Sequence, residues 1–176
     1  AMTLYAVTDS AWTGGQTLME QVKDALDGGI TFLQLREKDL EYDAFLQEAI
    51  EMAKLSRKYG VPFVINDEVE IALKCGADGV HVGQEDMACR NARDILGPDK
   101  IIGVSVHNVK EALKAQADGA DYLGLGAVKA TPTKTDASVV EFEEIKKVCD
   151  AVNIPVVAIG GIKKDNMMEL KGSHVD

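Results

Sequence analysis

The sequence predicts an α/β fold, a (β/α)8 barrel of the TIM type, on the strength of three observations. Short apolar runs recur along the whole chain, amphipathic stretches lie between them, and nearly every apolar run ends in polar or glycine residues. Strict alternation of strand and helix selects a parallel α/β architecture. In an all-parallel barrel the C-terminal strand ends meet at one mouth, where the active site lies. The polar residues at the strand ends therefore predict an enzyme.

The apolar runs predict the strands of this barrel. They are apolar almost continuously, as expected where both faces of a parallel sheet are covered. The predicted strands lie near residues 3–8, 31–36, 62–66, 79–82, 101–105, 122–126 and 155–159.

The stretches between these runs predict amphipathic helices. In the second stretch, Phe45, Ala49 and Met52 recur at helical spacing, which predicts that Glu48 and Glu51 face water. Glycines come after the ends of several helices, where a left-handed residue is needed, at Gly60, Gly76 and Gly119. The predicted helices lie near residues 17–28, 42–59, 68–75, 89–96, 109–118, 141–151 and 165–171.

The residues directly after the first strand favour the barrel over a doubly wound sheet. A doubly wound sheet commonly carries a glycine-rich loop there, whereas this chain has Thr8-Asp9. No run for an eighth strand is found in the segment Gly172 to Asp176, and the 176 residues are short against the ~250 of a typical barrel. We therefore expect one barrel domain over residues 1–176, incomplete at its C-terminal end and lacking the eighth strand and helix.

Composition excludes several classes of function. The formal net charge of −10 repels a nucleic-acid backbone, and no long apolar stretch predicts a membrane span or a signal peptide. We therefore expect a cytoplasmic protein with small-molecule substrates, no nucleic-acid partner and no membrane partner; a homo-oligomer is compatible with the sequence. The cysteines, Cys75, Cys89 and Cys149, are too far apart for a metal knuckle and are interpreted as free thiols.

Two cations after the second predicted strand are candidates for binding an anion. Arg36 and Lys38 are separated by one residue, so both side chains can point the same way in extended backbone and hold a group such as a diphosphate. The alternative is a surface charge cluster with Glu37 and Asp39.

Oxygen-bearing side chains after the next two strands predict a magnesium site. Asn66-Asp67 and Asp86 end neighbouring strands, and Mg²⁺ typically binds one or two carboxylates together with waters and substrate phosphates. The alternative for Asp67 and Asp86 is capping of the next helices along the chain.

Two later segments are candidates for holding a phosphate. Thr131, Thr133 and Lys134 offer two hydroxyls and an ammonium after the sixth strand, although Thr-Pro-Thr is also an ordinary turn. Gly160-Gly161 precedes a predicted helix and exposes backbone N–H groups, although a tight turn needs glycines too. His81 is interpreted as a packing residue, and His107, which lies just beyond Ser105 after the fifth strand, as a weak candidate.

Taken together, these segments closely resemble the thiamine phosphate synthase family, also called thiamin-phosphate pyrophosphorylase. The family is a (β/α)8 barrel that joins a hydroxymethylpyrimidine diphosphate to a thiazole phosphate and releases pyrophosphate. The matching stretches run in order through almost the whole chain: Tyr5-Ala6-Val7-Thr8-Asp9, Gln34-Leu35-Arg36-Glu37-Lys38, Ile65-Asn66-Asp67, His81-Val82-Gly83-Gln84-Glu85-Asp86, Gly103-Val104-Ser105, Thr131-Pro132-Thr133-Lys134 and Ala158-Ile159-Gly160-Gly161-Ile162.

The resemblance implies a role for each matching residue. The catalytic residues would be Ser105, Lys134 and Arg36, and Mg²⁺ would be bound by Asp67 and Asp86. The pyrimidine and its diphosphate would be held by Gln34, Arg36, Lys38, Asn66 and Lys134, and Ser105 would contact the reacting pyrimidine or the pyrophosphate. The thiazole phosphate would be held by Thr131, Thr133, Gly160 and Gly161.

The sequence departs from the family pattern at Lys129-Ala130, where the family usually has an aromatic residue and a proline. We therefore expect a different shape for that loop.

One alternative function is the related thiazole tautomerase, which needs no pyrimidine diphosphate site. The other is an inactive or strand-exchanged barrel fragment, as the missing eighth strand suggests.

Overall fold

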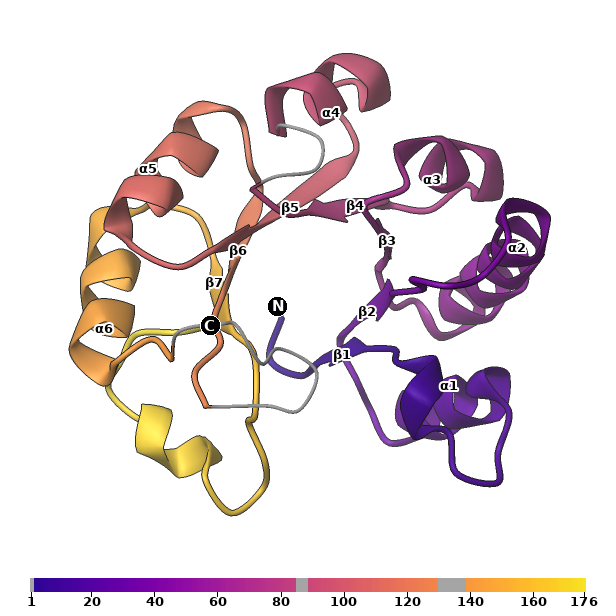
Figure 1. Ribbon diagram of the computed structural model, residues 1–176, viewed down its shortest axis with the longest axis horizontal. Coiled ribbons are helices and arrows are strands. Elements are labelled where there is room, and N and C mark those ends of the chain that lie inside the picture. The colour runs from indigo at the N-terminus through magenta and orange to yellow at the C-terminus, as the bar shows by residue number, and fades with distance from the viewer. Residues whose placement is uncertain (1, 85–88, 130–138) are drawn as a thin grey trace. The chain divides into compact units, whose positions relative to one another are not determined.

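The computed structural model describes residues 2–84, 89–129 and 139–176, and alternates strands with helices along the chain (Figure 1). Strand order follows the sequence from β1 to β7. The strands are β1 (Tyr5–Val7), β2 (Phe32–Leu35), β3 (Phe63–Asn66), β4 (Gly79–Val82), β5 (Ile101–Val106), β6 (Tyr122–Leu125) and β7 (Val156–Ala158).

The helices occupy the intervals that their spacing predicts, with one exception. They are α1 (Leu18–Asp27), α2 (Tyr42–Tyr59), α3 (Val69–Cys75), α4 (Cys89–Leu96), α5 (Val109–Ala117) and α6 (Phe142–Ala151), with the short 3-10 helices η1 (Ser10–Trp12) and η2 (Met167–Leu170). The exception is the helix predicted near residues 165–171, because this segment forms only the short 3-10 helix η2. Asn166 binds Lys163 N and Gly161 O through its side chain, at 2.7 and 2.9 Å, and such local bonds compete with a helix.

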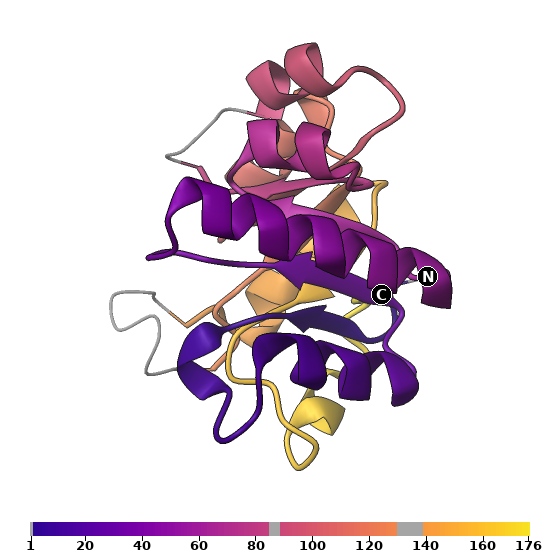
Figure 2. The ribbon, with the colours of Figure 1, turned by 90° about the vertical axis from the view of Figure 1, so that its right-hand side faces the viewer.

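The chain divides into two compact units: Ala1–His81 with Ala92–Ile101, and Val82–Asn91 with Ile102–Asp176. In the first unit, β1, β2, β3 and β4 pair in parallel. The α1 and α2 helices lie side by side and cover these strands (Figure 2). A capping box between Thr17 and Glu20 starts α1, and left-handed Gly60 and Gly76 end α2 and α3, as predicted.

The buried face of α2 differs from the prediction at one position. Phe45, Ala49 and Met52 are buried as expected. Glu48 does not face water: its side chain is half-buried, and its Oε1 atom is fully buried. The helical period places residue 48 at the edge of the apolar face, where partial burial is possible.

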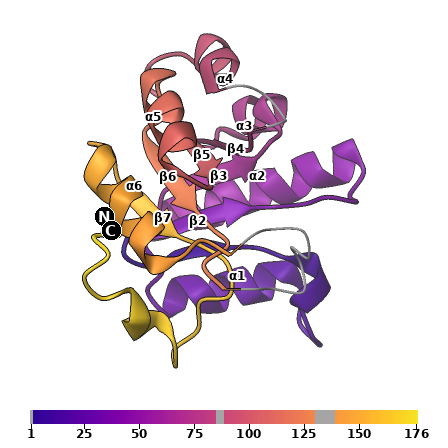
Figure 3. The same cartoon turned by 60° about the vertical axis from the view of Figure 1, so that its left-hand side comes forward.

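In the second unit, β5, β6 and β7 pair in parallel, with α5 packed beside α6 (Figure 3). Tyr122 is one of the largest fully buried side chains in the described part of the chain. Its ring lies against Gly103, where an added Cβ would come within 2.1 Å of it, so Gly103 makes the space that Tyr122 fills. No helix in the described ranges is both long enough and apolar enough to cross a membrane.

One carboxylate contact recurs at the start of the strands. Before β4, Asp78 N donates to Phe63 O and Phe63 N donates to Asp78 Oδ2, both at 2.8 Å. Asp121 makes the same two bonds with Ile102, also at 2.8 Å. Asp176 makes them with Val156 at 2.9 Å. In each case the aspartate side chain accepts from a backbone N–H near the start of one strand. Its own backbone N–H donates to the same residue, which aligns the two segments.

We expect Asp78→Ala to lower the free energy of unfolding by about 1–3 kcal/mol, because it leaves the N–H of buried Phe63 without its acceptor. Urea denaturation measures the change. Asp78→Asn keeps an acceptor oxygen and should lose less, and the exposed helical residue Asp94 provides the control Asp94→Ala. Equal losses in Asp78→Ala and Asp94→Ala would contradict this role.

Candidate functional site

The first group of predicted site residues begins with Gln34, a polar side chain buried within β2. It is only 2% exposed, and its Nε2 donates to the Tyr5 hydroxyl at 2.5 Å. The Tyr5 ring in turn meets Phe32 edge to face, with the ring centroids 4.8 Å apart. A buried amide needs hydrogen-bond partners, and this one is held in a fixed orientation. Sequence reasoning missed Tyr5, whose hydroxyl fixes the amide.

Arg36 and Lys38 come after β2 and are held by groups after neighbouring strands. Arg36 N donates to Thr8 Oγ1 at 2.9 Å, and its guanidinium Nη1 lies 4.0 Å from Asp9 Oδ2. Lys38 Nζ lies 2.9 Å from Asp67 Oδ2. The alternative of a surface cluster with Glu37 and Asp39 does not describe these pairs. Both cations stay partly exposed and accessible to an anion, with side-chain exposures of 30% and 49%.

Asn66 and Asp67 lie together at the end of β3. Asn66 Nδ2 donates to Asp67 Oδ2 at 2.7 Å, so this oxygen accepts from both an amide and the Lys38 ammonium. Asp67 has a positive φ of 65°, which is uncommon outside glycine. The α3 helix has Glu68 as its N-cap residue and no side-chain cap. The capping alternative is therefore wrong for Asp67.

The donor chemistry at Asp67 fits a magnesium ion. Mg²⁺ commonly takes one or two carboxylates and completes its shell with water and substrate phosphate. In the described residues, no group of three or more His, Cys, Asp or Glu side chains could hold a metal by itself. A metal at Asp67 would therefore depend on further ligands. Asp86, the second predicted ligand, lies outside the described residues.

His81 is a buried imidazole beside these groups. It is 4% exposed and lies opposite Asn66 in the parallel register of β3 and β4. Asp67 N donates to its backbone oxygen at 2.9 Å. The burial agrees with its interpretation as a packing residue. The register nevertheless puts it next to the site, because paired residues of neighbouring strands share a face.

In the second unit, Ser105 lies near the end of β5, opposite Gly124. Its backbone oxygen accepts a hydrogen bond from Gln84 Nε2 at 2.9 Å. His107 lies just beyond, where both its backbone N and its Nδ1 bond Glu111 Oε2, at 2.8 and 2.9 Å. These bonds give His107 a structural role at the start of α5.

Gly160 and Gly161 come after β7 and have positive φ values of 95° and 69°. The segment after β6 lies directly on them: Lys129 N donates to Gly160 O at 3.0 Å. A Cβ on Gly160 would lie 2.8 Å from Ala127 Cβ, and one on Gly161 would lie 2.6 Å from Lys129 Cβ. Both glycines are therefore required by close packing as well as by backbone conformation.

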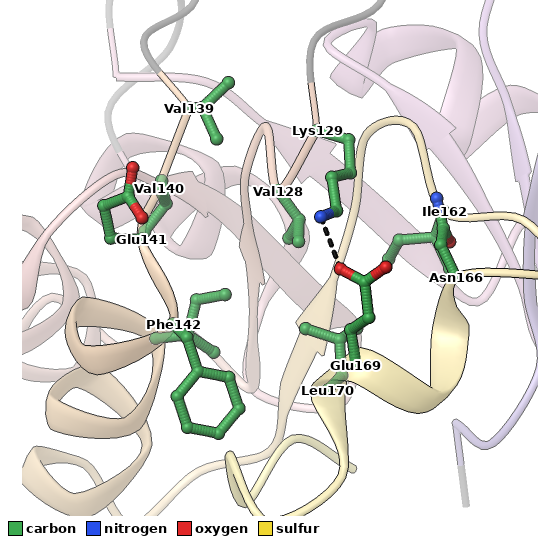
Figure 4. A pocket seen from close by; sticks show the side chains of 11 residues that line it. Val128, Lys129, Val139, Val140, Glu141, Phe142, Ile162, Asn166, Glu169 and Leu170 are labelled. Atoms are coloured by element: carbon green, nitrogen blue, oxygen red, sulfur yellow. Dashed lines mark hydrogen bonds and ion pairs between the residues drawn. The ribbon is translucent and has the colours of Figure 1, made fainter.

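Lys129, where the sequence departs from the family pattern, forms an ion pair across this region. Its Nζ lies 2.5 Å from Glu169 Oε2 of η2 (Figure 4). The pair borders a cavity of about 260 Å³ that is also lined by apolar side chains, including Val128, Phe142 and Leu170. Ala130, Thr131, Thr133 and Lys134 lie outside the described residues.

Two of the cysteines, Cys75 and Cys149, are not activated as nucleophiles. Burial raises the pKa of Cys75, and burial together with the nearby charges of Asp176 and Asp150 raises the pKa of Cys149 to about 11. Both thiols stay protonated at neutral pH. Cys75, Cys89 and Cys149 form no disulfide, in agreement with their interpretation as thiols.

Comparison with known proteins gives one consistent result. The family model described as "Thiamine monophosphate synthase" matches residues 4–176. A thiamine-phosphate synthase of Caldanaerobacter subterraneus subsp. tengcongensis is 49% identical over 168 residues, which cover 96% of this chain and 78% of the relative. One from Methanobrevibacter smithii is 46% identical over 175 residues, covering 99% of this chain and 83% of the relative.

The solved structures agree on the fold. A thiamine phosphate pyrophosphorylase from Pyrococcus furiosus superposes with a TM-score of 0.91 at 40% identity, over 99% of this chain and 82% of that one. An N-acetylmannosamine-6-phosphate 2-epimerase from Clostridium perfringens has a TM-score of 0.69 at 14% identity, over 98% of this chain and 82% of that one, which is a likeness of fold alone. The predicted TIM-barrel fold class is confirmed.

We expect Gly161→Ala to destabilise the protein more than Gly14→Ala does. Both glycines have positive φ, 69° and 60°, so both variants lose roughly 1–2 kcal/mol to backbone conformation. Only at Gly161 does the new Cβ collide with a neighbour, whereas Gly14 has nothing within 4 Å. Overpacking adds about 1–3 kcal/mol, measurable by thermal or urea unfolding. Equal losses in the two variants would mean that packing places no demand on Gly161.

Proposed function

Because the chain belongs to the thiamine monophosphate synthase family, we propose that it forms thiamine phosphate from a hydroxymethylpyrimidine diphosphate and a thiazole phosphate, with release of pyrophosphate. It is a transferase of thiamine biosynthesis, because its relatives are named thiamine-phosphate synthases and its structural neighbour is named a thiamine phosphate pyrophosphorylase. The observation that carries the substrate assignment is the pair of cations after β2, each held by a carboxylate yet still partly exposed. Such cations suit a diphosphate leaving group.

The pyrimidine diphosphate is assigned to residues of the first unit, and the family resemblance adds Lys134 and Asp86 of the second unit. Gln34, fixed by Tyr5, and Asn66, fixed by Asp67, would orient the pyrimidine. Arg36 and Lys38 would hold the diphosphate, joined by Lys134. Asp67 and Asp86 would hold Mg²⁺, which when bound supplies positive charge against the diphosphate.

The thiazole phosphate is assigned to the second unit. Backbone N–H groups at Gly160 and Gly161, with the hydroxyls of Thr131 and Thr133, would hold its phosphate. Ser105 would contact the reacting pyrimidine or the departing pyrophosphate. The requirement for glycine at positions 160 and 161 supports the assignment only in part, because packing against Ala127 and Lys129 also explains it.

The proposed reaction is a dissociative substitution. The carbon–oxygen bond to the diphosphate breaks and pyrophosphate leaves with the electron pair, giving a resonance-stabilised pyrimidine methylene cation. The lone pair of the thiazole nitrogen then forms the new carbon–nitrogen bond. No proton has to move in either step, so the chain's residues need to bind, orient and neutralise charge. A site without a strong general base fits this chemistry.

The thiazole tautomerase alternative is not favoured, because the matched relatives are named as synthases and the chain retains Arg36, Lys38, Asn66 and Asp67. The cytoplasm remains the proposed location, since phosphorylated substrates are charged and cross a bilayer only at high cost. A single domain over residues 1–176 and a homo-oligomer remain proposals as well.

The first test is formation of thiamine phosphate from the two substrates, with Mg²⁺ and with a chelator. We expect activity with Mg²⁺ and almost none after chelation. Asp67→Ala should sharply reduce kcat while the unfolding midpoint changes little, because residues after barrel strands carry function more than stability. Full activity of Asp67→Ala at limiting Mg²⁺ would refute the metal assignment.

The second test concerns Arg36. A charge-assisted contact to phosphate is worth roughly 1.5–3 kcal/mol, so Arg36→Ala should lower kcat/KM for the pyrimidine diphosphate by about 10- to 100-fold. Arg90→Ala is the matched control, since Arg90 is 73% exposed and pairs with Asp118 on a different part of the chain. A wild-type kcat/KM in Arg36→Ala would exclude Arg36 from diphosphate binding.

A further inference from the structure

A threonine hydroxyl joins the two strands at each end of the β1–β2 pair. Before the pair, Thr31 Oγ1 accepts from Leu4 N at 2.9 Å and donates to Leu4 O at 3.3 Å. After the pair, Thr8 Oγ1 accepts from Arg36 N at 2.9 Å and donates to Arg36 O at 3.4 Å. One hydroxyl can make both bonds because it carries a hydrogen and two lone pairs. The two threonines therefore make the same contacts at opposite ends of one strand pair.

Only one of these two contacts lies at the candidate site. Thr31 holds Leu4 at the N-terminal ends of β1 and β2, where residues of a barrel serve stability. Thr8 holds Arg36 at the C-terminal ends of the same strands, where residues of a barrel carry function. Thr8 is only 7% exposed, so water does not readily replace the bonds of its hydroxyl. The family resemblance includes Thr8 but implies no role for it.

The two residues after Thr8 contact the same segment. Asp9 is the N-cap residue of η1, and its Oδ1 accepts a backbone N–H there at 3.0 Å, which fixes the carboxylate. Its Oδ2 lies 4.0 Å from Arg36 Nη1. Ser10 Oγ donates to Glu37 Oε2 at 3.1 Å. Three consecutive residues after β1 therefore contact the segment that follows β2.

These contacts act on the two ends of one long side chain. The hydroxyl of Thr8 fixes the backbone from which the Arg36 side chain starts, and the carboxylate of Asp9 attracts the guanidinium at its far end. An arginine free to move has many rotamers, and binding an anion would have to remove that freedom. Fixing the side chain beforehand lowers this cost of binding.

We propose that Thr8 positions Arg36 and thereby raises the affinity of the site for the substrate diphosphate. The binding part of this inference rests on the proposed function, whereas the ordering of Arg36 by Thr8 does not. Thr8 is a positioning residue, since it acts through the backbone of Arg36. Without its hydroxyl, Arg36 N loses its acceptor, and the segment after β2 has to be ordered when the diphosphate binds.

The first experiment measures the order of Arg36 without substrate. Hydrogen exchange reports on its backbone N–H, and nitrogen-15 relaxation of Nε reports on its side chain. We expect a protected amide and a restricted side chain in the wild type and in Thr8→Ser, which keeps the hydroxyl. Thr8→Val has nearly the same shape without the hydroxyl and should lose both. An Arg36 side chain equally ordered in wild type and Thr8→Val would overturn the proposal whether or not the chain makes thiamine phosphate.

The second experiment measures binding of inorganic pyrophosphate with Mg²⁺ by calorimetry. Thr8→Val should bind about 3- to 10-fold more weakly than the wild type, the range expected for one hydrogen bond. Thr31→Val is the matched control, because it removes the same two bonds at the other end of the strand pair. It should keep the wild-type affinity, and Thr8→Ser should keep most of it.

Kinetics and unfolding separate positioning from general destabilisation. Both valine variants lose the bonds of one hydroxyl, so we expect comparable decreases in the free energy of unfolding. Only Thr8→Val should raise KM for the pyrimidine diphosphate, and KM for the thiazole phosphate should stay unchanged in both variants. If the wild type binds pyrophosphate but the two valine variants bind it equally well, positioning is refuted. If the wild type binds no pyrophosphate, the proposed function fails instead.

A second variant covers failure of Thr8→Val to fold. Thr8→Ala also lacks the hydroxyl, and it places no methyl group against the backbone of Arg36. It should show the same loss of order at Arg36 and the same weaker binding of pyrophosphate. Wild-type order and affinity in Thr8→Ala would overturn the proposal, as would rapid exchange of the Arg36 amide in the folded wild type.

Discussion

The register of the parallel strands is the constraint on which the rest of the structure depends. A shift of one residue would turn every strand side chain to the opposite face. Backbone pairing alone only weakly prevents such a slip, and aspartates at some of the strand starts add a second bond, as Asp78 does with Phe63 and Asp121 with Ile102. With the register fixed, Gln34 stands beside Val7 and Val64, and His81 beside Asn66. The strand register therefore decides which polar side chains stand beside one another, and the aspartates help to hold it.

Patterns repeated along the chain were enough to predict most of the fold. Continuous apolar runs predicted the strands, and helical spacing predicted α2 and α4 with the bounds that the structure shows. The errors arose where one side chain meets a distant segment. The helical position of Glu48 predicts an exposed side chain, yet the side chain is half-buried and its Oε1 atom is fully buried. Just before η2, the Asn166 side chain bonds backbone atoms of Gly161 and Lys163, and hydrophobic periodicity does not predict such bonds.

The candidate site was predictable in its residue types and less so in its pairings. Position after a strand was enough to nominate Arg36, Lys38 and Asp67. The sequence could not show that Lys38 pairs with Asp67, because the partners come from different strand ends. It also could not separate two reasons for glycine at position 161, since phosphate binding and close packing make the same demand. The ion pair of Lys129 with Glu169 has no sequence signal beyond its departure from the family pattern.

An acidic chain that binds a diphosphate has to arrange its charges locally. The net charge of −10 opposes an anionic ligand at long range, but salt screens that field within about 10 Å. At short range, Asp9 and Asp67 hold Arg36 and Lys38 in place before any ligand arrives, which lowers the entropy that binding must remove. The same carboxylates weaken the field of the cations, so any further negative charge nearby is costly. Partial exposure of both cations leaves them able to meet a diphosphate in spite of that weaker field.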